Sequence, residues 1–343
     1  MPKDIIVIGA SAGAVEALRV LVGRLPADLP ASLFVVVHTA PESLALLADI
    51  LDHFGTLPAT NAKDGERIRP STIYVAPPDR HLLVEPNRVR VTRGPRENRF
   101  RPAIDPLFRS AAQTYGPRVV GVILTGYLDD GTAGLWTVKQ LGGMAVVQDP
   151  ADALVPFMPL SAVTHVKVDY CLPLEEIAPL LVRLTTEAAE EEGAFQIPEK
   201  VEIEVNIAKE QKALDAGVLQ LGEPSNYACP ECHGVLLQMK EDKLFRFRCH
   251  TGHAYSVESL LTDITEKMDD ALWNSIRAFE EGELFMRHMA QHLDHGDNSQ
   301  FAESILKRAD ETKRRANLMR QAAGKGGGLQ AARSSPDAER SGS

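Results

Sequence analysis

Short apolar runs alternate with amphipathic segments over the first 187 residues, and this alternation constrains the fold more than any other feature of the chain. The apolar runs are strand-length and lack a polar face, which is typical of strands buried on both sides. Strands separated by helices predict an α/β domain over 1–187 with a doubly wound, mostly parallel, Rossmann-like sheet. The expected strands are Ile5–Ile8, Leu33–Val37, Ile73–Val75, Val119–Leu124, Met144–Val147 and Val166–Val168. The expected helices are Val15–Val22, Leu44–Phe54, Pro106–Tyr115, Ala133–Leu141 and Leu174–Thr185.

Residues 82–91 depart from this pattern, because two alternating runs are joined there by Pro86-Asn87. Such a pair of runs with a turn between them predicts an antiparallel hairpin. We expect the hairpin at an edge of the sheet.

The composition changes after Thr186, where an acidic stretch and mixed polar sequence predict a linker over 188–226 with one short helix near Lys209–Leu219. A compact Cys/His segment follows at 227–257. Two long amphipathic patterns then predict a helical hairpin over 258–323. Residues 324–343 offer no apolar side chains for a core and are expected to be a disordered tail.

Charge and hydropathy exclude several functional classes. The 343 residues include 37 basic and 47 acidic side chains, a net charge of −10, which argues against non-specific nucleic-acid binding. No apolar run reaches the roughly 18 residues of a membrane helix, and no signal peptide precedes the first strand, so we expect a cytoplasmic protein without membrane insertion.

Polar residues follow three of the expected strands. Ser11 lies in the small-residue turn Gly9-Ala10-Ser11-Ala12-Gly13, His38 ends the second strand, and Asp130 lies just beyond Leu124. Ligand crevices of open parallel sheets form at the carboxyl ends of strands, so these residues are candidates for a nucleophile, a base and an orienting carboxylate. The spacing leaves two alternatives open. Asp129 competes for the orienting role, and His81 is a second candidate base.

A glycine-rich turn after the first strand also marks dinucleotide-binding folds. Those folds carry an acidic residue at the end of the second strand and the spacing Gly-x-Gly-x-x-Gly. Here the second strand ends in His38-Thr39-Ala40, and the glycine spacing differs. The nucleotide-binding reading is therefore disfavoured.

The Cys/His segment has the spacing of a structural zinc site. Cys229 and Cys232 form one Cys-x-x-Cys knuckle, and Cys249 with His253 forms a second. Three sulfurs and one nitrogen suit tetrahedral zinc, with His250 as the competing fourth ligand. We expect a closed site that supports a zinc-ribbon-like module, and no cofactor for catalysis.

Six sequence blocks in order resemble the chemotaxis receptor methylesterase (CheB) family, and the resemblance spans about residues 4–185. The blocks are Ile8-Gly9-Ala10-Ser11-Ala12-Gly13, Val37-His38, residues 73–82, residues 101–110, Leu124-Thr125-Gly126 with Asp130-Gly131, and Phe157-Met158-Pro159.

This resemblance implies a protein-glutamate methylesterase, also a glutamine deamidase in some members, acting on the cytoplasmic helices of methylated chemoreceptors or a related signalling protein. It assigns Ser11 as nucleophile, His38 as general base and Asp130 as the residue that orients His38. Backbone N–H groups near Ala12 and Gly13 would hold the oxyanion. A further hypothesis is a basic rim that attracts acidic receptor helices, formed by Arg93, Arg96, Arg99 and Arg101, and the alternative is a solvated loop without a binding role.

The chain departs from the family pattern in three respects. Ala14 replaces a usual glycine, and Tyr127-Leu128 replaces a common Met-Gly that helps shape the oxyanion pocket. The receiver domain that normally precedes this esterase is not expected, because the first strand begins near residue 4. These departures leave a second hypothesis open, a non-catalytic signalling scaffold that retains the fold. Extensions like residues 227–273 are known on stand-alone members, and the resemblance assigns them no role.

Overall fold

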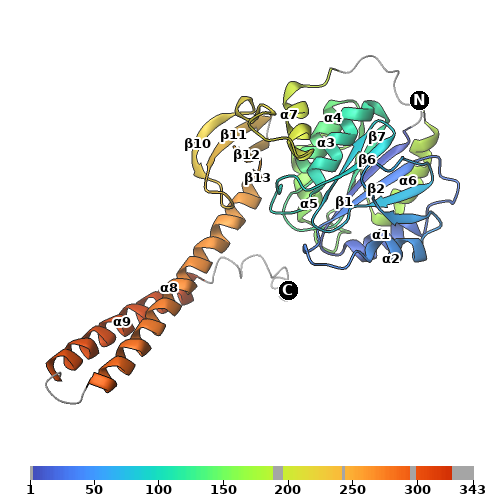
Figure 1. Ribbon diagram of the computed structural model, residues 1–343. Coiled ribbons are helices and arrows are strands. Elements are labelled where there is room, and N and C mark those ends of the chain that lie inside the picture. The colour runs from blue at the N-terminus through green and yellow to red at the C-terminus, as the bar shows by residue number, and fades with distance from the viewer. Residues whose placement is uncertain (1–2, 188–195, 242–243, 294–298, 327–343) are drawn as a thin grey trace, which may run out of the picture. The chain divides into compact units, whose positions relative to one another are not determined.

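A parallel sheet with helices on both faces organises the first 187 residues in the computed structural model, which describes residues 3–187, 196–241, 244–293 and 299–326 (Figure 1). Seven strands of this described part pair in parallel in the order β3-β4-β2-β1-β7-β8-β9. They are β1 Ile5–Ala10, β2 Ser32–Val37, β3 Ala59–Asn61, β4 Thr72–Val75, β7 Val119–Ile123, β8 Met144–Gln148 and β9 Tyr170–Leu172. The predicted fold class is confirmed.

The strand order reverses at β1, and this reversal determines where a crevice forms at the edge of the sheet. From β1 the chain builds β2 and β4 on one side, then crosses to build β7, β8 and β9 on the other. Connections that leave adjacent strands in opposite directions open a crevice at the strands' carboxyl ends. The loops after β1, β2 and β7 therefore meet at one edge.

Alternate side chains of the buried strands feed two separate cores. Ile6 and Ile8 pack with α1 and α6, whereas Ile5 and Val7 pack with α3, α4 and α5. Both cores are apolar, which is why the strands read as continuous hydrophobic runs rather than alternating ones. The helices of this domain are α1 Ala14–Val22, α2 Leu47–Phe54, α3 Ile104–Tyr115, α4 Thr132–Gln140, α5 Phe157–His165 and α6 Leu174–Thr186, with the 3-10 turn η1 Gly116–Arg118.

Three elements differ from the sequence prediction. The last strand is β9 at Tyr170–Leu172 and not Val166–Val168, because Val166 caps α5, where its N–H donates to the Ala162 carbonyl. Helix α5 was not predicted, although Pro159 lies in its first turn, where proline costs no hydrogen bond. The short β3 was also missed, since its three residues are only half-buried.

The predicted hairpin forms, but not at an edge of the main sheet. Strands β5 His81–Glu85 and β6 Arg88–Thr92 pair with each other as a separate two-stranded sheet. The hairpin packs on α3 instead, and the Val84 N–H donates to Ser110 Oγ at 3.0 Å. Leu82 and Val84 bury their side chains in the core that α3 shares with one face of the main sheet.

Part of the predicted linker is folded. Helix α7 Glu199–Ala208 packs on α3, and the 3-10 turn η2 Val218–Gln220 follows it, in place of the helix expected near Lys209–Leu219. Ile203, Ile207 and Val218 share a small core with Leu237 and Met239 of the following sheet. Residues 188–195 lie outside the described residues.

A four-stranded antiparallel sheet follows in the order β10-β11-β12-β13, which we call the ribbon. Its strands are β10 Glu223–Ala228, β11 Val235–Glu241, β12 Leu244–Cys249 and β13 Ala254–Ser256. The ribbon belongs to the same compact unit as the parallel sheet, residues 1–261.

Residues 262–343 make up the second compact unit, whose described part is a pair of long helices. They are α8 Val257–Leu293, which begins in the first unit, and α9 Ser299–Gly326. Buried Ala302, Ile305 and Ala309 recur at helical spacing on α9, and Arg287 pairs with Asp310 across the hairpin. The helices form as predicted, and α9 extends three residues further. The rest of the predicted tail lies outside the described residues. No described helix is long and apolar enough to cross a membrane.

A buried carboxyl joins α3 to α4 at the functional edge. Asp105 Oδ1 accepts from the Gly134 N–H at 2.6 Å, and Oδ2 accepts from Asn98 Nδ2 at 3.0 Å. Burial, and next the negative charge of Asp130, raise the pKa of Asp105 to about 7. The folded protein therefore holds a proton here that the unfolded chain releases near pH 4.

This raised pKa predicts how stability depends on pH. A carboxyl with a raised folded-state pKa lowers the free energy of unfolding as pH rises from about 4 to about 7, by at most about 1.4 kcal/mol per pH unit. We expect Asp105→Asn to lose this contribution, so its free energy of unfolding should fall less steeply between pH 4 and pH 7 than that of wild type. Urea unfolding can be followed by Trp136 fluorescence in a Trp273→Phe background. The exposed Asp64→Asn is the matched control and should keep the wild-type slope. Equal slopes for Asp105→Asn and wild type would contradict the prediction.

Candidate active site

The three predicted catalytic residues come together at the carboxyl edge of the sheet. Ser11 follows β1, His38 follows β2, and Asp130 lies in the loop between β7 and α4. Ser11 Oγ lies 3.1 Å from His38 Nδ1, and His38 Nε2 lies 2.7 Å from Asp130 Oδ2. His38 thus links two residues that lie 27 and 92 positions away in the sequence into one hydrogen-bonded chain.

The imidazole of His38 is fixed in position and in tautomer. An ionised carboxylate only accepts hydrogen bonds, so Nε2 carries the proton that binds Asp130, and Nδ1 presents its lone pair to the Ser11 hydroxyl. The Phe100 ring stacks on the imidazole with centroids 3.7 Å apart and planes 5° from parallel. Only 3% of the His38 side chain is exposed. The base therefore has little freedom to turn away from the nucleophile.

Asp130 is a buried carboxylate with a full set of donors. Besides His38, its oxygens accept from the Ile104 N–H at 2.7 Å, Asn98 Nδ2 at 2.9 Å and the Gly131 N–H at 3.0 Å. Burial alone would raise the pKa of Asp130, but the hydrogen bond and charge of His38 and these further donors hold it below its usual value. Asp130 is therefore ionised at neutral pH.

The two alternatives left open by the sequence lie elsewhere. Asp129 accepts a hydrogen bond from Ser256 Oγ at 2.7 Å, not from His38. His81 is fully buried, donates from Nε2 to the Pro95 carbonyl at 2.9 Å and accepts from the Ala103 N–H. Burial lowers the pKa of His81, so it is a neutral structural histidine.

The turn that carries Ser11 is held tightly against the end of β7. Gly13, just before α1, adopts a left-handed conformation with φ 78°, and this conformation favours glycine. The Ser11 N–H donates to the Thr125 carbonyl, and Thr125 Oγ1 donates to the Ala12 carbonyl. A Cβ at Gly126 would lie 2.8 Å from Ser11 Cβ. These contacts fix the position of Ser11 relative to the residues that follow β7.

An open pocket of about 530 Å³ lies in front of Ser11 and His38. Ala12, Arg96, Arg99 and Phe100 also line it. The N–H groups of Ala12 and Gly13 precede α1, where backbone donors have no partner within the helix. Tyr127 is not among the lining residues; the residue is 56% exposed, and its ring stacks on Phe157. The oxyanion assignment to Ala12, Gly13 and Tyr127 stays a prediction.

Three of the four arginines of the expected basic rim line the pocket, namely Arg96, Arg99 and Arg101. Arg93 and Arg101 pair with Asp79 at 2.9 Å and 2.6 Å. Asp79 thus offsets part of the positive charge.

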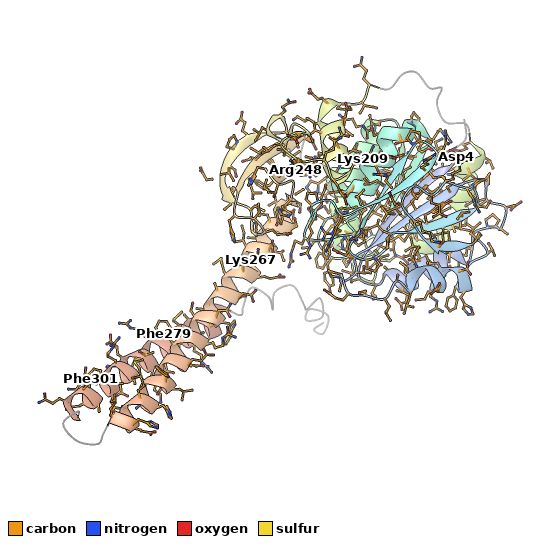
Figure 2. All side chains as sticks on the ribbon, in the orientation of Figure 1. Asp4, Lys209, Arg248, Lys267, Phe279 and Phe301 are labelled. Atoms are coloured by element: carbon orange, nitrogen blue, oxygen red, sulfur yellow. The ribbon has the colours of Figure 1, made fainter. Side chains whose placement is uncertain are left out.

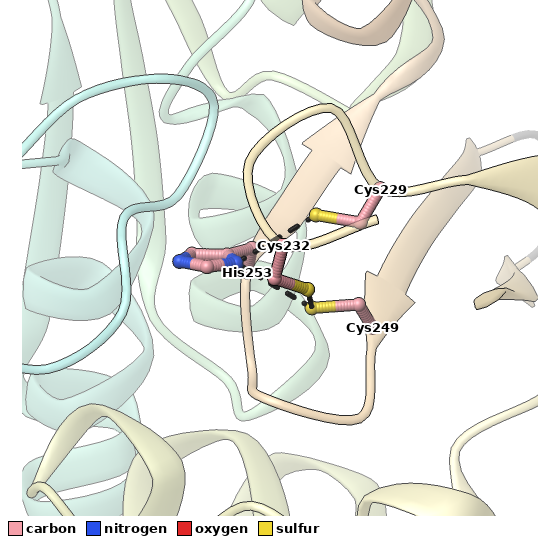
Figure 3. Close-up of side chains that lie close together, drawn as sticks. All are labelled: Cys229, Cys232, Cys249 and His253. Carbon is pink, nitrogen blue, oxygen red and sulfur yellow. Dashed lines mark hydrogen bonds between the residues drawn. The ribbon is translucent and has the colours of Figure 1, made fainter. Parts of the chain in front are cut away.

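A second cluster of functional side chains lies in the ribbon (Figure 3). Cys229, Cys232, Cys249 and His253 bring their ligand atoms within 4.8 Å of one another. His253 Nδ1 is 3.6 Å from the sulfurs of Cys229 and Cys249, and the Cys232 and Cys249 sulfurs are 3.6 Å apart. Ligands of tetrahedral zinc stand about 3.5–3.8 Å apart, given Zn–S near 2.3 Å and Zn–N near 2.0 Å. The cluster has the donors and spacing to hold a metal ion.

The structure distinguishes the two candidate histidines of the cluster. His253 contributes a ligand atom to it, whereas the His250 ring packs against Gly234, where a Cβ would lie 2.2 Å from it. His253 Nε2 also lies 3.3 Å from a Glu231 carboxylate oxygen. A carboxylate on the outer nitrogen is the usual way to orient a metal-binding imidazole.

Sequence reasoning missed two residues that hold the site, Asn98 and Phe100. Both lie in the segment 94–101 between β6 and α3, which follows no strand of the main sheet. Asn98 and Arg99 have positive φ angles of 49° and 78°. The asparagine itself was the available signal, since this residue tolerates the left-handed conformation and its side chain forms local hydrogen bonds in turns.

Comparisons with known proteins agree with this geometry. A relative from Leptospira interrogans is 40% identical over 185 residues, which are 54% of this chain and 96% of the relative. Protein-glutamate methylesterase/protein-glutamine glutaminase 1 of Xanthomonas campestris pv. campestris is 40% identical over 189 residues, and the match spans about half of each chain, 54% here and 52% there. The crystal structure of the Thermotoga maritima CheB methylesterase catalytic domain matches with a TM-score of 0.51 and 35% identity, covering 53% of this chain and 98% of that domain.

The sequence pattern described as CheB methylesterase matches residues 6–181, the part of the chain that carries the sheet and all three residues of the Ser11–His38–Asp130 chain. This chain belongs to the CheB methylesterase family.

Proposed function

We propose that this chain is a protein-glutamate methylesterase that hydrolyses glutamyl methyl esters on the helices of methylated chemoreceptors or a related signalling protein. The hydrogen-bonded chain from Ser11 through His38 to Asp130 is the observation that carries the proposal. The names of relatives supply the substrate class. Because the receptor helices that carry these esters are cytoplasmic, the proposal includes a cytoplasmic location.

The first half-reaction uses the hydrogen bond between Ser11 and His38. As Ser11 Oγ bonds to the ester carbonyl carbon, His38 Nδ1 takes the hydroxyl proton, and the Asp130 carboxylate stabilises the imidazolium through Nε2. The N–H groups of Ala12 and Gly13 are our candidates for binding the oxyanion. The imidazolium then protonates the methoxy oxygen, the carbon–oxygen bond breaks, and methanol leaves an acyl-Ser11 intermediate.

Water completes the reaction by the reverse proton path. His38 Nδ1 takes a proton from the attacking water and returns it to Ser11 Oγ as the acyl bond breaks, which releases the glutamate carboxylate. The same steps on a glutamine side chain would release ammonia in place of methanol. This parallel chemistry is the basis for proposing glutaminase activity as well.

The competing hypothesis of a non-catalytic scaffold rests on Ala14, Tyr127 and Leu128. None of the three interrupts the hydrogen-bonded chain. Ala14 is buried in the first turn of α1, and Tyr127 stacks on Phe157. Leu128 occupies a left-handed conformation, φ 61°, which suits the glycine common in the family and costs a leucine about 1 kcal/mol. That cost falls on stability rather than on chemistry.

We further propose that the Cys229, Cys232, Cys249 and His253 cluster holds one structural zinc ion. Four protein ligands close the coordination sphere, so the site leaves no position for a substrate. Its role would be to stabilise the ribbon, a sheet too small to rely on its own core.

Removing the nucleophile tests the esterase proposal. Ser11→Ala deletes the only atom that forms the acyl intermediate, so we expect methanol release from methylated receptor to fall about 10⁴-fold or more. Gas chromatography of released methanol measures the rate. The control Ser275→Ala alters a serine of the helical hairpin and should retain wild-type turnover. Equal release by wild type and Ser11→Ala would reject the enzyme in favour of the scaffold.

Elemental analysis tests the metal site. Purified full-length protein should contain about one zinc per chain, and Cys229→Ser should contain close to none, since three remaining ligands bind zinc far more weakly. Cys171→Ser is the matched control, because Cys171 is an exposed cysteine on β9 outside the cluster. We also expect faster proteolysis within 223–256 in Cys229→Ser. A wild-type zinc content in Cys229→Ser would refute the ligand assignment.

A further inference from the structure

The ribbon and the catalytic residues contact the same short segment, residues 94–101. We propose that Asn98 is a positioning residue through which the ribbon, and the metal that it holds, fix Asp130 and His38 in their reactive arrangement. Metal loading of the ribbon then controls the reactivity of Ser11. The inference deepens the proposed function. It depends on the proposed function only for the identity of the natural substrate.

Asn98 bridges the triad and the ribbon with a fully used side chain. Its Nδ2 donates to Asp130 Oδ1 at 2.9 Å and to Asp105 at 3.0 Å. Its Oδ1 accepts from the Ser256 N–H at 2.9 Å and from Ser259 Oγ at 3.2 Å. Asn98 is 5% exposed, so water does not replace these partners. One amide therefore donates to the catalytic carboxylate and accepts both from Ser256 of the ribbon and from Ser259 in the first turn of α8, directly after the ribbon.

The backbone of the segment is also held by the ribbon. The Asn98 N–H donates to the Ala254 carbonyl at 2.8 Å, and the Ala254 N–H donates to the Arg96 carbonyl at 3.2 Å. Segment 94–101 is thereby attached alongside β13 through a bridge between Glu97 and Ala254. Phe100, two residues after Asn98, stacks on His38. The segment that β13 holds thus contacts both His38 and Asp130.

A buried ion-pair network anchors the same segment to β12. Arg248, labelled in Figure 2, is fully buried and binds Glu97 at 3.0 Å and Glu204 at 2.6 Å. Glu97 also pairs with Arg109 of α3. These pairs join α3, α7 and the ribbon at one point next to Asn98.

The metal ligands adjoin the two ribbon residues that hold the segment. Cys249 follows Arg248, and His253 precedes Ala254. The knuckle between them is closed by the Cys249 N–H, which donates to the His253 carbonyl, and by Arg248 Nη1, which donates to the Gly252 carbonyl at 2.8 Å. A metal bound to Cys249 and His253 would fix the ends of β12 and β13, and with them the contacts to Glu97 and Asn98.

Segment 94–101 has a conformation that needs such support. Arg99 occupies the left-handed region, φ 78°, which is unfavourable for arginine and persists only where surrounding contacts impose it. When the ribbon loosens, Asn98 Oδ1 loses the hydrogen bonds that it accepts from Ser256 and Ser259, and the segment can relax. Asp130 then loses a donor, and His38 loses the Phe100 ring.

The test uses full-length protein and a reagent that needs no natural substrate. A fluorophosphonate labels Ser11 at a rate that reports the arrangement of the triad. After zinc is removed with 1,10-phenanthroline and its loss is checked by elemental analysis, we expect labelling to slow by about 10²-fold, the usual effect of ångström-scale misplacement. Added zinc should restore the rate. An unchanged rate in metal-free protein would overturn the proposal. So would a loss of labelling that accompanies unfolding of the sheet domain, measured by Trp136 fluorescence in the Trp273→Phe background.

Two variants separate positioning from general stability. Asn98→Ala should lower kcat with little change in KM, since Asn98 is not among the residues that line the pocket in front of Ser11. Metal removal should then slow Asn98→Ala far less than it slows wild type, because the link is already cut. Ser259→Ala removes the donor to Asn98 that lies in the first turn of α8, just after the ribbon, and should lower the labelling rate. The control Ser225→Ala on β10 should not lower it. Additive effects of Asn98→Ala and metal removal would contradict the coupling.

The outcomes also distinguish this inference from the proposed function. If labelling follows zinc content while methylated receptor is not hydrolysed, the coupling stands and the substrate assignment falls. If receptor is hydrolysed at the same rate with and without zinc, the substrate assignment stands and the coupling falls.

Discussion

The buried carboxylate of Asp130 is the charge around which the functional edge of the molecule is assembled. An ionised carboxylate without water is costly unless donors surround it, and here they come from His38, the start of α3, the loop before α4 and Asn98. Each donor requires its own segment to be in place. The catalytic base, the α3–α4 packing and the segment 94–101 are therefore parts of one polar arrangement.

The sequence was sufficient to predict those parts that the parallel sheet dictates. Continuous apolar runs identify buried strands, and the carboxyl ends of such strands meet at one edge, so Ser11, His38 and Asp130 could be grouped before any distance was known. Asp129 and Asp130 are adjacent and chemically identical, so only the loop geometry separates them. In that loop Asp130 binds His38, whereas Asp129 binds Ser256.

The contacts between the ribbon and the sheet domain were beyond sequence reasoning for a physical reason. Glu97 and Arg248 are 151 residues apart, and a charged residue in a polar stretch gives no sign of its partner. The alternating pattern around Arg246 and Arg248 indicates a strand, but in a small sheet it does not say which face is covered. Likewise, His250 and His253 both have ligand spacing, and the fold of the knuckle around Gly252, φ 100°, determines which one enters the cluster.

The polar character of this junction agrees with a contact in which orientation matters. Arg246 binds Glu204 through two parallel hydrogen bonds, at 2.8 Å and 3.0 Å, and such paired contacts fix direction as well as distance. Buried ion pairs often stabilise no more than well-packed apolar side chains of the same volume. An apolar junction would hold the ribbon as firmly but would leave it freer to slide. Functional groups tolerate errors of only about half an ångström, and Asn98, between the junction and Asp130, is where such a slide would be felt.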